Sequence, residues 1–446
     1  MKRETIGTLG RSAFAAICIL SLAGGATGAQ QVTAIQGGTV LTMAGETIEE
    51  GTVLIRDGKI AEVGRNVRVP AGADIIDASG KYVMPGIIDA MTYYGIRPFE
   101  LNDPSNPVTP QNRVIEAYYP FGEFMRGAAG IQKEGDLISG GVTAAYIAPG
   151  NRQVIGGQGA VVKTWGDDFD SMILSEPAAM DMTIGETAKR EQQNPTTRMG
   201  IAALLRKALL DAQEFGRSLE AYEQKRAEGD QEARPPGRDL GNEALLRLLK
   251  REIPARIEVD YLDDIRTAIR ISEEFGFDLI LDSGLGAYRI KDVLAEKGIP
   301  VVLGPPMHPF VAGGEVSMNA DLYNLMSEYN AAELTDAGVE IAIGSFGFGF
   351  GSFGGATQGR WLLLEAAYAT GFGLSDEDAL RAVTINAARI LGVDDRIGSL
   401  EVGKDADIIV LDGYPLHVKT WVEKVLINGE LIHERTAANP SSSPPP

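Results

Sequence analysis

The stretch that decides the fold runs from Tyr82 to Gly95 and reads Tyr-Val-Met-Pro-Gly-Ile-Ile-Asp-Ala-Met-Thr-Tyr-Tyr-Gly. It is largely apolar, and its one carboxylate, Asp89, lies near the end of the expected strand. Side chains two positions apart in a strand point the same way. Met91 and Tyr93 are therefore expected to share one face.

Both ends of the chain have the pattern of short β-hairpins. An Asp-Gly pair at 57–58 separates two strand-like runs, and an Asn-Gly pair at 428–429 separates two others. Such pairs are the strongest short-range signal for a hairpin. We expect residues 30–84 and 396–435 to form one small composite β-sandwich domain.

Between these segments, short apolar runs alternate with helix-like ones. The strand-like runs are 142–147, 160–163, 255–260, 278–283, 299–303 and 339–343, and the helix-like runs include 261–275, 287–297, 322–337 and 358–370. Short, continuously apolar strands followed by helices are typical of a parallel sheet covered by helices. The pattern and its length predict an α/β fold, a (β/α)8 TIM-like barrel over residues 85–395.

Two motifs resemble those of the amidohydrolase superfamily, a group of metal-dependent hydrolases. Residues 84–95 keep the Pro-Gly-x-x-Asp framework of its signature strand, and Thr384–Gly392 with Arg396–Asp407 resembles its C-terminal hallmark. The resemblance covers nearly all of the mature chain and is closest to the exported, imidazolonepropionase-like branch. It implies a barrel with one or two divalent metals at the carboxyl ends of its strands, where the metal activates a water.

The resemblance also implies where the metal ligands lie. The family has histidine or aspartate at places where this chain has Met91, Tyr93, Asp260, Ser283 and Phe346. A thioether suits soft ions rather than Zn²⁺, and a phenol is seldom ionised at neutral pH. The whole chain has three histidines. We expect no metal and no other cofactor, whereas an active form would need a divalent metal such as zinc.

Five other side chains are candidates for catalysis or ligand binding: Asp89, Lys163, Glu258, Asp260 and His308. Glu258 and Asp260 share a strand face and with Asp89 could form an oxygen-rich site for Ca²⁺ or Mg²⁺, or they pair with Arg or Lys. Lys163 lies where some relatives use a carboxylated lysine to bridge two metals, but without the histidine partners we favour a plain barrel lysine. Asp89 is expected to be a hydrogen-bonded structural carboxylate. His308 is expected near the barrel mouth, in contact with hydrogen-bond partners or substrate.

Phenylalanine and glycine alternate in the stretch 346–355. Glycine permits close approach of the backbone, and phenylalanine supplies apolar bulk. Our hypothesis is that Phe346, Phe348 and Phe350 fill the space that a metal and its ligands would occupy. The alternative is an exposed glycine loop.

The N-terminus has the pattern of a secretory signal peptide. Basic residues precede the apolar run 13–20, and small residues follow up to Ala29. The apolar run is too short to span a bilayer, so we expect residues 1–29 to be removed and the mature chain to have no membrane span. The only cysteine, Cys18, lies in this segment. A mature chain without disulfides fits a bacterial periplasm or secretion.

The net charge of −20 argues against binding to nucleic acid or to anionic membranes. The tail, residues 436–446, is rich in serine and proline and is expected to be disordered.

Three functions remain open. The first is an exported pseudoenzyme of the superfamily that binds a small-molecule or peptide-like ligand, or forms a homo- or hetero-oligomer with a family relative. The second is an active hydrolase of carbon–nitrogen bonds in peptide-like or cyclic amide substrates, with an atypical site built from the candidates above. The third is a solute-binding protein that stacks peptides or sugars on Tyr93, Tyr94 and the Phe-rich stretch.

Overall fold

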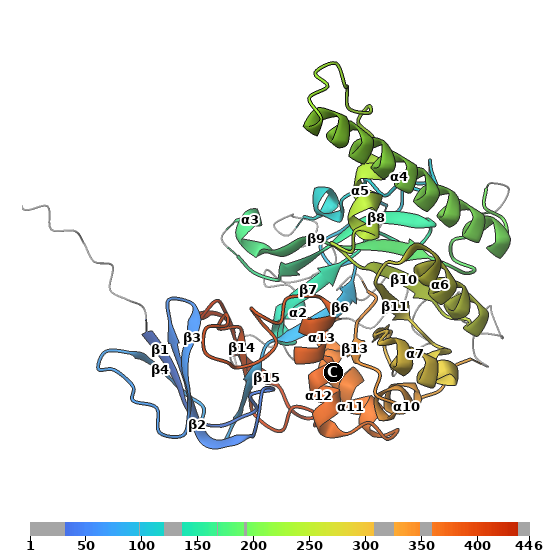
Figure 1. The fold of residues 1–446 in the computed structure, drawn as a ribbon. Coiled ribbons are helices and arrows are strands. Elements are labelled where there is room, and N and C mark those ends of the chain that lie inside the picture. Colours follow the sequence, from blue (N-terminus) through green and yellow to red (C-terminus); the bar gives the residue numbers. More distant parts are fainter. Residues whose placement is uncertain are drawn as a thin grey trace, which may run out of the picture.

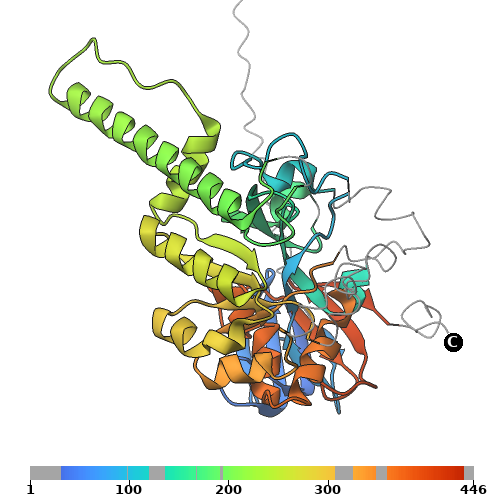
Figure 2. The ribbon, with the colours of Figure 1, turned by 90° about the vertical axis from the view of Figure 1, so that its right-hand side faces the viewer.

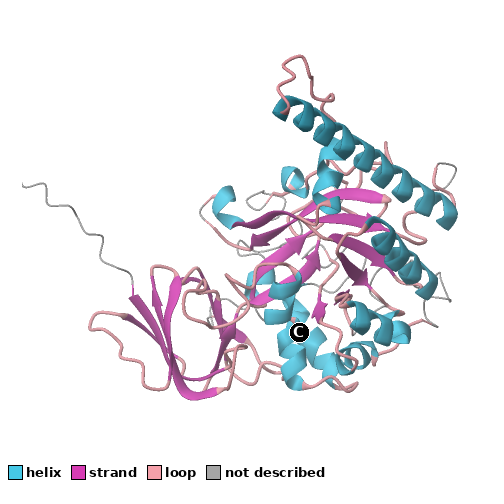
Figure 3. Cartoon of the chain, viewed as in Figure 1, coloured by secondary structure: helices cyan, strands magenta, loops and turns pink. Residues whose placement is uncertain are grey.

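The computed structural model describes residues 32–97, 99–119, 136–166, 168–190, 194–306, 325–347 and 359–435. Within these residues the chain forms two eight-stranded sheets (Figure 1). One sheet makes a small domain, which contains strands from both ends of the chain. The other makes a barrel, and most helices lie around that barrel (Figure 3).

The small domain has the strand order β16-β15-β14-β5-β1-β2-β3, with β4 beside β1. Its strands are β1 (Val32–Val40), β2 (Ile48–Arg56), β3 (Lys59–Gly64), β4 (Asp74–Asp77), β5 (Tyr82–Pro85), β14 (Ile408–Leu411), β15 (Val422–Ile427) and β16 (Glu430–Glu434). Strand β5 joins the two halves, because it pairs in parallel with β1 and antiparallel with β14. The expected composite β domain is confirmed.

Both hairpin turns have the backbone that their sequences predict. Asp57 and Gly58 have φ angles of 49° and 77°, and Asn428 and Gly429 have 51° and 76°. Positive φ at both central residues is what a type I′ turn requires. The two turns also touch, since a Cβ on Gly58 would lie 2.8 Å from the carbonyl oxygen of Asn428. This contact fixes one hairpin against the other.

The barrel sheet has the order β13-β12-β11-β10-β9-β8-β7-β6. Its strands are β6 (Ile87–Thr92), β7 (Val142–Ile147), β8 (Ile155–Lys163), β9 (Ile173–Thr183), β10 (Ala255–Val259), β11 (Leu279–Ser283), β12 (Val301–Leu303) and β13 (Ile341–Ile343). The expected TIM-like barrel is confirmed, with one difference: β8 runs antiparallel to β7 and β9. The link 148–154 is the reason, because a parallel crossover needs a dozen or more residues.

The chain just after β13 nearly closes the barrel against β6. The backbone N–H of Phe346 donates to the carbonyl of Met91, and the N–H of Tyr93 donates to the carbonyl of Gly347, both at 2.8 Å. Ser345 lies between them and donates to Asp89 from its N–H and its hydroxyl. The first and last barrel strands are therefore joined at the rim formed by the carboxyl ends of the parallel strands.

Helices cover the outside of the barrel. They are η1 (Val114–Ala117), α2 (Asp136–Ser139), α3 (Phe169–Met172), α4 (Arg198–Ala227), α5 (Leu240–Leu249), α6 (Leu262–Phe275), η2 (Ala287–Ile290), α7 (Lys291–Lys297), α10 (Asn330–Asp336), η3 (Gly359–Trp361), α11 (Leu362–Thr370), α12 (Asp376–Ala382) and α13 (Ile385–Ile390). Helix α4 buries Leu205 and Leu209 in its first half and projects away from the barrel in its second (Figure 2). Among the described residues, a search for helices long and apolar enough to cross a membrane finds none.

Candidate functional site

Four strands contribute to a buried polar network in the barrel. Arg256 on β10 donates from Nε and Nη2 to the carboxylate of Asp282 on β11, over distances of 2.7–3.2 Å. The guanidinium carbon lies 3.8 Å from the centre of the Tyr146 ring on β7. The Tyr146 hydroxyl donates to Asp181 Oδ2 on β9 at 2.7 Å. All four side chains are buried, and the sequence analysis named none of them.

Gly159 on β8 makes room for this network. A Cβ at this position would lie 2.0 Å from Tyr146 Oη and 2.7 Å from Asp181 Oδ2. Real Cβ atoms do not approach that closely, so any side chain here would separate the tyrosine from the aspartate. Gly159 on the antiparallel strand β8 therefore leaves the space that the hydrogen bond between Tyr146 and Asp181 needs.

The network holds one fixed positive charge. Burial raises the pKa of Asp181 to about 8, against the lowering effects of Arg256 and of the Tyr146 hydrogen bond. Burial also raises the pKa of Asp282, although the Arg256 guanidinium opposes this. For Arg256, burial favours the neutral form, but the charge of Asp282 outweighs it and raises the pKa above its ordinary value. At neutral pH the guanidinium is charged and Asp181 is mainly protonated.

Glu258 and Asp260 lie next to each other at the rim, as the sequence predicts from their spacing. Asn151, from the link between β7 and β8, donates from Nδ2 to Glu258 Oε1 at 2.6 Å. Burial raises the pKa of Glu258 to about 8, and the charge of Asp260 adds to the effect. Asp260 accepts a hydrogen bond of 2.6 Å from the Ser283 hydroxyl, and burial raises its pKa as well.

Asp89 is fully buried at the closure of the barrel. It accepts hydrogen bonds from the backbone N–H of Ser345 at 2.8 Å and from its hydroxyl at 2.6 Å. Burial raises its pKa to about 6, and the Ser345 hydrogen bonds limit the rise. In the part of the chain that the structure describes, a search for three or more His, Cys, Asp or Glu side chains able to hold one metal finds no such group. Asp89, Glu258 and Asp260 therefore do not form the oxygen-rich site considered above.

At positions 91, 93 and 346, where the resemblance also places metal ligands, the side chains are ones that bind metals weakly or not at all. Met91 and Tyr93 are buried. Burial raises the pKa of the Tyr93 phenol well above 10, and the charges of Glu258, Asp181 and Asp282 add to the effect. Phe346 is half-buried and packs against the barrel core. His308, Phe348 and Phe350 lie outside the described residues.

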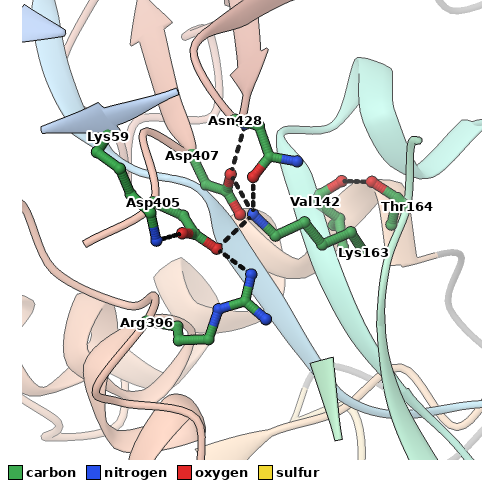
Figure 4. Close-up of polar contacts among 8 residues, drawn as sticks. All are labelled: Lys59, Val142, Lys163, Thr164, Arg396, Asp405, Asp407 and Asn428. Atoms are coloured by element: carbon green, nitrogen blue, oxygen red, sulfur yellow. Dashed lines mark hydrogen bonds and ion pairs between the residues drawn. The ribbon is translucent and has the colours of Figure 1, made fainter. Parts of the chain in front are cut away.

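Lys163 does not lie at this rim, which corrects its expected place at a metal-bridging position. Because β8 is antiparallel, its end lies beside Ala144 near the start of β7, at the opposite end of the barrel. There the buried ammonium donates to Asp405 Oδ2 at 2.8 Å and to Asp407 Oδ1 at 2.9 Å (Figure 4). Asn428 Oδ1 is a third acceptor. Lys163 thus connects the barrel to the small domain.

Asp405 collects two further cations at the same junction. Lys59 donates to its Oδ1, and Arg396 Nη2 donates to its Oδ2 at 2.8 Å (Figure 4). Burial alone would raise the pKa of Asp405, but Lys163 and the other donors hold it below its ordinary value. Asp405 is therefore an ionised carboxylate that binds three cations between the two sheets.

Comparison with known proteins identifies the family. A crystal structure of an amidohydrolase from Thermotoga maritima MSB8 is 34% identical to this chain, with a TM-score of 0.79 over 90% of this chain and 100% of that one. The model of the Amidohydrolase family matches residues 321–432. The chain belongs to the amidohydrolase family.

Two curated relatives add to this assignment. The chain is 27% identical over 389 residues to the amidohydrolase tasK of Hapsidospora irregularis, which covers 81% of this chain and 37% of that protein. It is 43% identical over 70 residues to an imidazolonepropionase of Thermoplasma volcanium, which covers 14% of this chain and 17% of that protein. This chain thus spans well under half the length of tasK. The resemblance to imidazolonepropionases expected from the sequence is confirmed.

Replacing Lys163 with methionine should destabilise the protein by about 3–5 kcal/mol, because the buried Asp407 would lose the cation it pairs with and Asp405 would lose one of three. Urea unfolding monitored by circular dichroism measures this. Lys207→Met is the matched control, since Lys207 pairs with Asp211 on the exposed surface of α4, and it should change the free energy of unfolding by less than about 0.5 kcal/mol. Equal effects of the two substitutions would contradict the role given to Lys163.

The raised pKa of Asp181 predicts a pH dependence of stability. Its pKa is about 8 in the folded chain and about 3.9 when unfolded. As pH rises between these values the unfolded state loses the proton first, so the free energy of unfolding should fall, by up to about 1.4 kcal/mol per pH unit. Glu258 acts in the same direction.

Urea unfolding at pH 5, 6, 7 and 8 tests this. The wild-type chain should be more stable at pH 5 than at pH 8, and Asp181→Asn should have a shallower slope. Asp211→Asn, on the exposed surface of α4, controls for the removal of one carboxylate. A slope that Asp181→Asn leaves unchanged would show that Asp181 ionises normally in the fold.

Proposed function

We propose that this chain is an exported, catalytically inactive member of the amidohydrolase family that acts as a binding protein or partner subunit. The observation that carries the proposal is the set of side chains at the barrel rim. Met91, Tyr93 and Phe346 stand where the resemblance places metal ligands, and none of them offers a ligand of the family type.

The donor chemistry at these strand ends does not fit the divalent metal that the family implies. The Tyr93 phenol keeps its proton, because burial and nearby carboxylates raise its pKa well above 10. The Ser283 hydroxyl donates a hydrogen bond to Asp260. Phe346 has no donor atom at all. A metal-bound water, which the family's reaction needs, would have too few ligands to hold its metal in place.

The rim nevertheless keeps polar and aromatic groups suited to holding a ligand. Glu258, Asp260 and Asn151 present carboxyl and amide groups, and Tyr93 adds an aromatic ring. A few polar groups set among apolar side chains are typical of small-molecule sites. These groups support a small-molecule or peptide-like ligand. The pattern of residues 1–29 supports export to the periplasm or the exterior.

A second candidate function is hydrolysis of carbon–nitrogen bonds without the family's metal centre. One observation favours it: burial raises the pKa of Glu258 to about 8, so this carboxyl group is protonated at neutral pH. A protonated carboxyl at a barrel rim is able to donate a proton to a leaving nitrogen, and the neighbouring Asp260 is able to orient a water. Both roles fall to Glu258 and Asp260, two of the candidates predicted from the sequence.

The first test is the metal content of the purified mature chain. After dialysis against an excess of Zn²⁺ or Mn²⁺ and then buffer, elemental analysis should find far less than one ion per chain. A metal-dependent amidohydrolase of similar length, treated in parallel, is the control for retention. One tightly held divalent ion per chain would overturn the proposal.

The second test separates binding from hydrolysis. The wild-type chain should bind members of a panel of dipeptides and cyclic amides, detected as a shift in the melting temperature, without releasing product. Glu258→Gln should weaken binding by about tenfold, because it alters a polar contact at the rim. If the wild-type chain releases product and Glu258→Gln lowers the rate by about 100-fold or more, the hydrolase reading is correct instead.

A further inference from the structure

We infer that the guanidinium of Arg256 replaces a metal ion as the fixed cation of this barrel, and that it keeps divalent ions away from the rim. This inference rests on the proposed function and adds a physical cause to it. The changed rim residues explain why a metal would be held weakly. Arg256 would also repel a metal even where ligands are supplied.

The contacts of Arg256 are those of a buried counter-ion to carboxyl groups, not those of a surface arginine. The side chain is 1% exposed. It binds both oxygens of Asp282 and lies over the Tyr146 ring, whose hydroxyl donates to Asp181. Carboxyl groups on β9 and β11, the two strands that flank β10, therefore lie near one organic cation. In a metal-dependent barrel, buried carboxylates are available to a metal ion, whereas here the guanidinium takes up the available negative charge.

The position of Arg256 places this charge just below the rim. Glu258 follows it two positions along β10, and two residues of a strand span about 6.6 Å. Asp260 comes just after the end of the strand. Asp282, its ion-pair partner, immediately precedes Ser283, one of the positions where the family has a ligand. Tyr93, another of these positions, lies close enough to Asp181 and Asp282 for their charges to act on its phenol.

Repulsion over this distance is substantial inside a protein. At about 6.6 Å, like charges repel several times more strongly in a protein interior than in water, and a divalent ion doubles the effect. Asp282 offsets part of this repulsion, because it pairs with the same guanidinium. The guanidinium cannot escape by losing its proton, since arginine stays charged in proteins. A buried cation held by the Asp282 carboxylate on one side and the Tyr146 ring on another also has little room to move aside.

The test supplies the missing ligands and asks whether Arg256 still prevents binding. In a chain carrying Met91→His and Tyr93→His, zinc affinity is measured by calorimetry with Arg256 present and with Arg256→Met. The inference predicts that Arg256→Met binds zinc at least about tenfold more tightly. Arg256→Lys, which keeps the positive charge, should bind as weakly as the parent.

One control variant and one replacement variant make the outcome decisive. Arg206→Met in the same background removes an arginine that pairs with Glu274 on the surface, and it should leave zinc affinity unchanged. If Arg256→Met does not fold, Arg256→Gln replaces it, because the amide can still donate to Asp282.

Equal zinc affinity with and without Arg256, or binding by neither protein, overturns the inference and leaves the proposed function intact. The proposed function fails separately, if the wild-type chain itself retains one divalent ion.

Discussion

The buried ammonium of Lys163 is the contact on which the arrangement of the two sheets depends. It comes from the last position of a barrel strand, β8, and its acceptors Asp405 and Asp407 lie just before a strand of the small domain, β14. Three charges with almost no exposure to water are stable only if they compensate one another. The Gly-Lys-Asp-Ala-Asp stretch, residues 403–407, ends the C-terminal motif that resembles the family hallmark, and it carries the anions that hold the barrel to the domain.

The sequence predicted those parts of the fold that local chemistry determines. The turns at 57–58 and 428–429 follow from the need for positive φ, and the strand Val142–Ile147 follows from an apolar run with the observed bounds. The direction of β8 was not predicted, because periodicity shows which residues are extended but not which way a strand runs. The link 148–154 does indicate the direction, because it is too short for the crossover that joins two parallel strands. The wrong placement of Lys163 followed from the same omission.

The candidate site was predicted only in part, for a similar reason. Glu258 and Asp260 were found because their spacing places them on one face of a strand. Asp181 and Asp282 were missed because they come from separate strands, and only the folded barrel brings them to Arg256. One signal was available: Arg256 and Glu258 alternate in the short strand β10, and Asp260 follows just after it. A strand buried on both faces is normally apolar throughout, so these charges indicated a polar barrel interior.

Two residues at the rim have a strained backbone. Ser283 and Phe346 both have left-handed backbones, with φ angles of 68° and 51°. Such a conformation costs a residue with a side chain about 1–3 kcal/mol, and strained residues cluster at functional sites. Glycine at either position would relieve the strain, yet the chain has a hydroxyl and an aromatic ring there. The hydroxyl binds Asp260 and the ring packs on the barrel core. The strained backbone therefore places the Ser283 hydroxyl against Asp260 and the Phe346 ring against the barrel core.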